Sequence, residues 1–478
     1  MNRASRIVIL LCLWLVPASW AQLENSIPAP TRTVSGTRIG HYKDGPVPID
    51  LSTRTIAALV PNGVGSYWTF SGTGTAAGTF SIPNVPYGYY LLQLGGRYIW
   101  TKNTVVNADY DLAYRSSAVT ADPATTLTFN LRNLNPWQTN DVLELVDTSA
   151  GAFELFPGGT EGETTFAGTF PYSSNLNDST QGDKTYLLQE STQYAGGYRI
   201  LVASSYFSPS NFTQVDAVDT QLTGKLRTIQ PNQSFRFNVN GADLAAATLA
   251  ANPGATIANT VFALDVFPGN MARGWIVSTP DLVSYDLNSD APPFTANADL
   301  GDVLYGNPFP KTFTLFALYQ YSAQTSYLAP GASSPAAITT FVYGSTVTLP
   351  TSTRPLRLMV GTVVQPAVGR ADFVANQSGM GLMPTLSWKP PKVGIAHAYQ
   401  VLVYQVTNTD GITAATTIAR LQTQGTSITI PPNVLIAGQA YVFQITTIYR
   451  PGVNVAANPY RLGPVVATAD VISGLMQP

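Results

Sequence analysis

The chain has 478 residues, of which only 11% are Lys, Arg, Asp or Glu, against about 25% in ordinary soluble domains. The net charge of −2 contains no block of like charge, which excludes the basic surface that nucleic acids and anionic membranes require. With 45% hydrophobic residues, 39 Gly and 35 Pro, the chain is too apolar for disorder and rich in turns. This composition predicts an all-β fold.

The N-terminus has the three parts of a secretory signal peptide. Arg3 and Arg6 precede an apolar run at residues 7–16, and Ser19 and Ala21 supply the small residues of a cleavage site. No stretch reaches the roughly 20 apolar residues of a membrane-spanning helix. We therefore predict export, cleavage after residue 21 and no membrane insertion of the mature chain.

The cysteine content agrees with this prediction. The only cysteine, Cys12, lies inside the signal peptide, so the mature chain has no disulfides and no thiol chemistry. Export without disulfides favours a bacterial source. We expect a secreted or cell-surface protein, with the periplasm as the alternative location.

A Pro-containing tether at residues 22–31 leads into a predicted domain at residues 32–107. In GTFSIPNVPYGYYLLQL, residues 78–94, one alternating strand leads through Pro86-Tyr87-Gly88 into a second strand. The upstream stretch TVSGTRI and a turn at Gly45–Pro48 supply the opening strand and its bend. This region resembles the carboxypeptidase regulatory-like (transthyretin-like) sandwich, with its Gly-x-Phe strand and Pro-x-Gly-x-Tyr turn. The resemblance implies an accessory module without catalytic residues.

Residues 108–354 resemble no family that we recognise, and we expect one or two sandwiches there. A faint likeness between TLTFNLRNL and SFRFNVNGADL indicates either two similar sandwiches or the ordinary likeness of amphipathic strands. Only the Ala-rich residues 242–251 look helical. Any specific activity is expected in this region. Strands are predicted at 126–134, 141–147, 198–207, 234–240, 261–267, 274–278, 313–321 and 339–349.

Residues 355–478 contain three further alternating strands. Leu386 and Trp388 share one face of the first, and a Gly three residues before Tyr441 lets the chain turn so that the phenol oxygen bonds back to the corner. This arrangement resembles a fibronectin type III domain, with Trp388 as core tryptophan and Tyr441 as tyrosine corner. The fold class expected for the whole chain is thus all-β, as tandem β-sandwiches. Such sandwiches host many functions, so the resemblance implies a fold and no task.

Histidine and cysteine chemistry is scarce. His41 and His397 are the only histidines and lie far apart in the sequence. A Ser-His-Asp hydrolase needs its histidine against both partners, and a zinc site needs several His or Cys ligands. We interpret both as surface or turn histidines, and we predict no catalytic residue and no cofactor-binding residue.

Paired carboxylates are the remaining route to catalysis, since a glycosidase needs only two of them beside a cleft. Glu161 and Glu163 belong to a Gly-rich loop, where solvated charge is the ordinary explanation. Glu144 lies on a predicted strand, and a pair such as Glu144 and Glu190 could meet across a cleft, although their spacing does not predict it. The five glutamates are Glu144, Glu154, Glu161, Glu163 and Glu190.

The acidic stretch Asp281–Asp302 partly resembles a calcium-binding loop. Residues 286–290 alternate oxygen ligands as such a loop begins, but Ala291 and Pro292 follow where a Gly is needed, and Asn297 replaces the closing Glu. Asp299 and Asp302 offer a different oxygen cage. We favour a turn-rich loop and predict no metal site; a metal, if bound, would be calcium.

Aromatic residues are plentiful, and Trp68 and Trp137, next to turns, are expected to be exposed. The favoured interpretation is a secreted, non-catalytic protein that binds an extracellular polymer, such as a polysaccharide or envelope component, or a surface protein. One alternative is a carbohydrate-active protein with a hydrolase or carbohydrate-binding module in residues 108–354. The other is a subunit of an envelope assembly, for which an exposed edge strand would be the sign.

Overall fold

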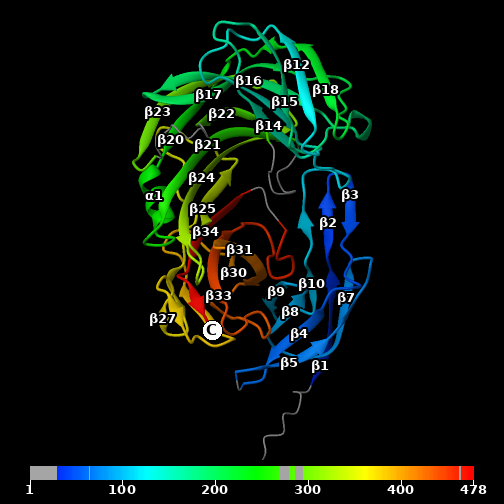
Figure 1. The fold of residues 1–478 in the computed structure, drawn as a ribbon, viewed down its shortest axis with the longest axis vertical. Helices are drawn as coiled ribbons and strands as arrows, with labels where there is room; N and C mark the ends of the chain where they lie inside the picture. Colours follow the sequence, from blue (N-terminus) through cyan, green and yellow to red (C-terminus); the bar gives the residue numbers. More distant parts are fainter. Residues whose placement is uncertain (1–29, 64, 269–278, 286–293, 462–464) are drawn as a thin grey trace, which may run out of the picture.

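The computed structural model of the chain describes residues 30–63, 65–268, 279–285, 294–461 and 465–478. These residues form stacked β-sheets with a single α-helix among them, so the all-β sandwich class is confirmed (Figure 1). The predicted signal peptide and the predicted strand at 274–278 lie outside the described residues. No helix in the described part of the chain is long and apolar enough to cross a membrane.

The first module, residues 31–107, is a sandwich of two sheets. One sheet has the strand order β10-β1-β7-β6 and packs against a second sheet that contains β4, β5, β8 and β9. Val34, Phe80 and Tyr90 lie in the core between the two sheets. The strands are β1 (Thr31–Thr37), β2 (Ile39–Tyr42), β3 (Gly45–Pro48), β4 (Ile56–Pro61), β5 (Tyr67–Ser71), β6 (Thr73–Gly74), β7 (Thr79–Pro86), β8 (Tyr90–Leu94), β9 (Arg97–Thr101) and β10 (Val105–Asn107).

The predicted turn at Gly45–Pro48 is wrong, because these residues form strand β3. The strand pairs antiparallel with β2, and β2 pairs on its other side with β11 (Tyr110–Asp111). Strand β3 is therefore an edge strand, where the missing N–H groups of Pro46 and Pro48 do no harm. The turn itself falls at Lys43 and Asp44.

The described residues of the middle region, residues 108–354, contain two large hydrophobic cores. Phe129, Phe156 and Phe166 lie in one, and Phe237, Phe262 and Tyr285 lie in the other. The predicted helix is present as α1 (Gly241–Leu249). The strands are β12 (Thr126–Arg132), β13 (Val142–Asp147), β14 (Ala152–Phe156), β15 (Thr165–Pro171), β16 (Tyr186–Ala195), β17 (Tyr198–Phe207), β18 (Asp219–Lys225), β19 (Arg227–Thr228), β20 (Gln233–Val239), β21 (Thr256–Pro268), β22 (Asp281–Tyr285), β23 (Ala298–Tyr305), β24 (Phe313–Tyr327) and β25 (Ala336–Thr346).

The last module, residues 364–478, has the core that the alternation predicts. Trp388, Tyr399 and Tyr441 are all buried in it. Gly438 has a φ of +78°, and the Tyr441 hydroxyl accepts a hydrogen bond of 2.8 Å from the Ile436 N–H, as predicted for the corner. The strands are β26 (Val364–Val368), β27 (Ala371–Asp372), β28 (Gln377–Ser378), β29 (Thr385–Lys389), β30 (Ala398–Thr409), β31 (Ile412–Thr423), β32 (Ser427–Thr429), β33 (Ala440–Tyr449), β34 (Val466–Ile472) and β35 (Met476–Gln477).

Removing the corner hydroxyl is expected to destabilise the protein. Tyr441→Phe leaves the Ile436 N–H without its partner, at a cost of about 1–3 kcal/mol. Denaturant unfolding should show a lower midpoint with an unchanged slope. Tyr194→Phe is the matched control, because that ring is 74% exposed. Equal midpoints for the two variants would contradict a structural role for the corner.

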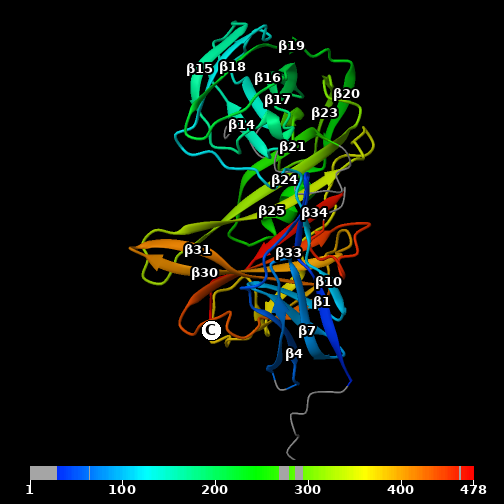
Figure 2. The same cartoon turned by 90° about the vertical axis from the view of Figure 1, so that its right-hand side faces the viewer.

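One hydrogen-bonded ladder of strands joins all three parts of the chain. It runs through β13, β16, β17, β22, β21, β24 and β25 of the middle region. Strand β25 pairs with β34 of the last module, and the ladder continues through β33, β30 and β31. Figure 2 shows β24 and β25 crossing the waist of the molecule, between the middle region and the two end modules.

The ladder reaches the first module through a parallel pairing of β31 with β9, in which residues 420–422 oppose residues 97–99. The sheet that contains β9 is buried on both faces. Leu92 and Ile99 pack into the first module's core, whereas Leu91 and Tyr98 pack into the core around Trp388. The first and last modules are therefore fused through a shared sheet, side by side in the lower half of Figure 1.

Candidate functional site

The junction of the first and last modules carries two pockets. Strand β9 contributes to both, because Trp100 lines one and Arg97 lines the other. We call the first the aromatic cleft and the second the arginine pocket.

The aromatic cleft has a volume of about 320 Å³ and combines rings with hydroxyl groups. Thr385 of β29 and Thr429 of β32 form a hydroxyl pair at 2.8 Å between their Oγ1 atoms. Burial raises the pKa of Tyr67, whose phenol also hydrogen-bonds to Thr429. The lining residues are Pro61, Gly63, Gly65, Ser66, Tyr67, Trp100, Met383, Thr385, Ser427, Ile428 and Thr429.

A stacked aromatic pair adjoins this cleft. The rings of Tyr89 and Trp100 lie 5.6 Å apart at an interplanar angle of 10°, and the Lys102 ammonium lies 5.6 Å from the Tyr89 ring centroid. Tyr89 is 51% exposed and the nearby Tyr87 is 60% exposed. Exposed aromatic faces beside hydroxyl groups suit a ligand with both apolar faces and polar edges, such as a sugar.

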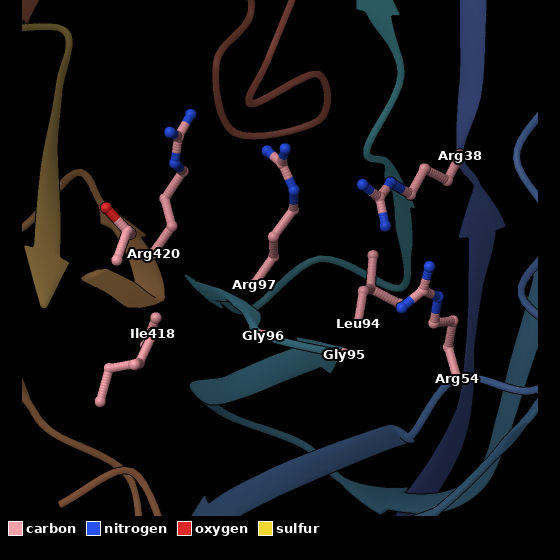
Figure 3. Close-up of a pocket in the computed structure, with 10 residues that line it drawn as sticks. Arg38, Arg54, Leu94, Gly95, Gly96, Arg97, Ile418 and Arg420 are labelled. Atoms are coloured by element: carbon pink, nitrogen blue, oxygen red, sulfur yellow. The ribbon is translucent and has the colours of Figure 1, made fainter. Parts of the chain in front are cut away.

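The arginine pocket has a volume of about 300 Å³. Arg38 and Arg54 come from the first module and extend their guanidinium groups toward each other, Arg97 follows the β8–β9 turn, and Arg420 comes from β31 (Figure 3). The backbone N–H of Arg420 donates to the Gly96 carbonyl at 3.0 Å, which fixes the two strands. The lining residues are Arg38, Arg54, Leu94, Gly95, Gly96, Arg97, Thr417, Ile418, Ala419 and Arg420.

These four side chains bring positive charge together; the exposed Asp50 lies near Arg54, because hydrogen bonds from Ser52 and then the charge of Arg54 lower the pKa of Asp50. Among the ion pairs formed by the described residues, none involves Arg38, Arg54, Arg97 or Arg420. Burial, followed by the charge of Arg97, lowers the pKa of Arg38 and of Arg420 below the usual arginine range. The Tyr460 ring lies 5.2 Å from the Arg97 guanidinium and covers it from one side.

The middle region holds a cluster of ionisable groups. It includes Glu144 and Glu190, whose contact the sequence did not predict. Val142 opposes Glu190 in the β13–β16 register, so Glu144, two residues along, lies on the same face. The Glu144 and Glu190 carboxyls share a hydrogen bond. Asp265 opposes Asp281 in β21–β22, and those two carboxyls also share one. We call these four residues the carboxylate cluster.

Burial favours the protonated forms of Glu144, Asp265 and Asp281. Desolvation raises the pKa of Glu144 well above its usual range, with a further contribution from the charge of Glu190. Desolvation and the charge of Asp281 do the same for Asp265, and burial raises the pKa of Asp281 to about 6. Glu144, Glu190 and Asp265 are at most 3% exposed. These carboxyls therefore lie inside the sheet, and the cluster does not present two carboxylates to solvent.

The other acidic residues singled out from the sequence do not join this cluster. Glu161 and Glu163 are exposed in their loop, and Glu154 accepts a hydrogen bond of 3.2 Å from the Ser173 hydroxyl. Asp299 and Asp302 pair with Arg236 at 2.8 and 3.6 Å. Residues 286–290 of the weighed calcium loop lie outside the described residues. In the described part of the chain, no three or more His, Cys, Asp or Glu side chains, those of the carboxylate cluster included, are placed so that they could hold a metal ion.

The histidines take up structural positions. His41 was expected at the surface or in a turn; it lies on strand β2 with its side chain 31% exposed, and its Nε2 lies 3.1 Å from Asp109. His397 precedes β30, where its Nδ1 accepts from the Arg450 N–H at 3.0 Å.

The prediction that Trp137 is exposed is wrong, because its side chain is 3% exposed. Its ring centroid lies 5.2 Å from that of Phe166, and Gly159 leaves room for the indole, since a Cβ there would lie 2.2 Å from it. Trp68 is half-buried and packs against the first module's core. Local turn signals fail here because a neighbouring loop folds over the ring.

Two features of the site were missed from the sequence. The four arginines are isolated in the chain and meet only through the β9–β31 pairing. Asp265 was detectable from the sequence, because it interrupts the apolar stretch VFALDVF. An ionisable group on a buried strand needs a hydrogen-bonding or charged partner.

Comparisons with known proteins supply no family. No family model matches the chain, and no curated protein matches it. Among solved structures, a tetra-tandem repeat in the extending region of a large adhesion protein aligns over 93% of this chain and 100% of that chain, at 12% identity and a TM-score of 0.13. A TM-score this low supports no statement about fold or function.

Proposed function

We propose that the protein is exported and acts outside the cell or at its surface as a non-catalytic binding protein for a polysaccharide or another envelope polymer. The observation that carries this proposal is the aromatic cleft with the adjoining Tyr89–Trp100 stack. Sugars present flat apolar faces rimmed by hydroxyls, and this surface offers rings beside Thr385, Ser427 and Thr429. The sandwiches that resemble accessory modules then serve as the frame that positions the cleft.

The fused junction supports a binding role in a second way. Tyr67 and Trp100 come from the first module, while Thr385 and Thr429 come from the last. The shared sheet holds these side chains in place before a ligand arrives, so little conformational entropy is lost on binding. Neither module alone contains the whole cleft.

Truncating the stacked rings is expected to abolish most polymer binding. The test is a pull-down of the mature protein with insoluble polysaccharides, peptidoglycan and whole cells, followed by titration of the polymer that binds. Trp100→Ala and Tyr89→Ala should each weaken binding by about tenfold or more, as losses of central aromatic anchors do. Binding should persist as salt is raised, because ring contacts on a weakly charged surface are little screened.

Tyr194→Ala is the matched control, because that ring is 74% exposed and lies far along the chain on β16. It should bind as the unchanged protein does. Retention of full binding by Trp100→Ala would refute the cleft as the binding surface.

The hydrolase alternative would use Glu144 and Glu190, which the structure buries and brings into direct contact. The same experiment separates the two, through analysis of the soluble fraction for released sugars or peptides. Products that disappear in Glu144→Gln would establish catalysis in the middle region. Intact polymer together with cleft-dependent binding would establish the binding function.

A further inference from the structure

The arginine pocket is an unusual place for charge in this chain. The whole sequence has 25 Lys and Arg, and four arginines line this one pocket. Arg97 and Arg420 are direct partners in the β9–β31 register. Like charges directly opposite each other destabilise a strand pair, so folding alone favours a different residue at one of these positions.

The surrounding structure holds this repulsion in place. The Arg420 N–H is bonded to the Gly96 carbonyl, and the Tyr460 ring lies over Arg97. The loop that carries Tyr460 is tied down by the buried Arg450, whose guanidinium donates to the carbonyls of Pro459 and Arg461 at 3.0 and 2.9 Å. The backbone that carries Arg97 and Arg420 and the loop over Arg97 are therefore fixed around the pocket.

None of the ion pairs between described residues includes a pocket arginine, although the exposed Asp50 lies near Arg54. Asp111 pairs with Arg461 at 2.8 Å and Asp109 pairs with His41, so both are engaged elsewhere. A cluster of guanidinium groups without an ion-paired carboxylate is the arrangement with which proteins bind oxyanions, since each planar fork donates two parallel N–H bonds.

We propose that the arginine pocket binds a doubly charged tetrahedral oxyanion, a phosphate or sulfate group, which bridges the first and last modules. Figure 3 shows Arg97 between Arg420 on one side and Arg38 on the other, with Arg54 beyond Arg38, so an oxyanion bound at Arg97 lies beside arginines of both modules. A pocket of about 300 Å³ admits one such group with part of the molecule that bears it. The site goes beyond the proposed polymer binding and does not depend on it.

The test compares thermal melting of the mature protein in phosphate, sulfate and chloride at equal ionic strength and pH, with calorimetric titration of inorganic phosphate. Phosphate and sulfate are expected to raise the melting temperature, and chloride is not, because a ligand that binds only the folded state stabilises it. Arg97→Gln and Arg420→Gln should each weaken phosphate binding by about tenfold or more. In chloride, Arg420→Gln should melt at the same temperature or higher, because the repulsion is relieved.

Arg370→Gln is the control, since that arginine is exposed in the turn between β26 and β27 and should leave the phosphate effect unchanged. Arg54→Gln changes an exposed side chain and keeps the test decisive if the strand variants fail to fold. Equal stabilisation by chloride, or a phosphate effect that survives in Arg54→Gln and Arg420→Gln, would overturn the proposal.

Glucose 6-phosphate identifies the source of the group. Tighter binding than inorganic phosphate shows a phosphoryl group carried by a sugar, and equal or weaker binding shows the free ion. Either result, lost in Arg420→Gln, supports the site.

Discussion

The protein is expected to become more stable as the pH is lowered from about 7.5 to about 5, the reverse of ordinary acid denaturation. The reason is the set of buried carboxyls. Burial raises the pKa of Asp147 and of Asp470 to about 6, and raises those of Glu144 and Asp265 well above the usual range. Asp147 and Asp470 are 0% and 4% exposed.

The direction follows from proton binding. Between pH 4 and 6, roughly the unfolded and folded pKa values of these groups, the folded protein holds protons that the unfolded chain has released. Stability therefore falls as the pH rises through this window. A rise in pKa from 3.8 to about 6 lowers the free energy of unfolding at neutral pH by about 3 kcal/mol for each such carboxyl.

Thermal or denaturant melts of the mature protein across this pH range measure the effect. Glu144→Gln should flatten the profile and raise stability at pH 7.5, about where the buried carboxyl is most costly, because the amide carries no charge to desolvate. Glu161→Gln provides the control on an exposed glutamate and should leave the profile unchanged. A stability that is flat or that increases toward neutral pH would refute the buried-proton account.

The second large effect is expected from the core of the last module. Trp388 is 5% exposed, and its ring packs edge-on against Tyr399 with the centroids 5.2 Å apart. Trp388→Ala empties that site and should cost about 3–5 kcal/mol. The loss should appear in unfolding of the whole mature chain, because Leu91 and Tyr98 of the first module belong to the same core.

Trp68→Ala is the comparison, since that ring is half-buried at the edge of another core and should cost less. An equal or smaller loss for Trp388→Ala would show that Trp388 is not the centre of the packing. The isolated last module is a poor test, because it would expose the apolar face that Leu91 and Tyr98 cover.

Local pattern was sufficient for the fold class and for most strands. The stretch Tyr198–Phe207 was predicted as a strand and is β17 with the same bounds, and the helix at 242–251 is α1 shifted by one or two residues. The tyrosine corner was also local, because Gly438 and Tyr441 are close in the sequence. These features depend on side-chain alternation and turn chemistry, which a single chain displays.

Which strands become neighbours was not predictable in this way. Neither residues 97–99 nor residues 420–422 carry a sequence pattern that predicts their pairing. The aromatic cleft and the arginine pocket both depend on this pairing. The sequence suggested that Glu144 and Glu190 could meet but did not predict that they do. Only the β13–β16 register brings the two carboxyls together. The prediction for Trp137 was wrong for a similar reason, because the loop that contains Gly159 covers the indole and the sequence around Trp137 does not indicate this contact.

The shared sheet also sets an order of events during synthesis. The first module leaves the ribosome early, but the partner for its strand β9 and the cover for Leu91 and Tyr98 are made about 320 residues later (residue 420 pairs with residue 97). Until residues 420–422 arrive, the nascent chain carries an open strand edge and an apolar face, the surfaces that aggregate most readily. Completion of this fold must therefore wait until residues 420–422 have been synthesised and can pair with β9.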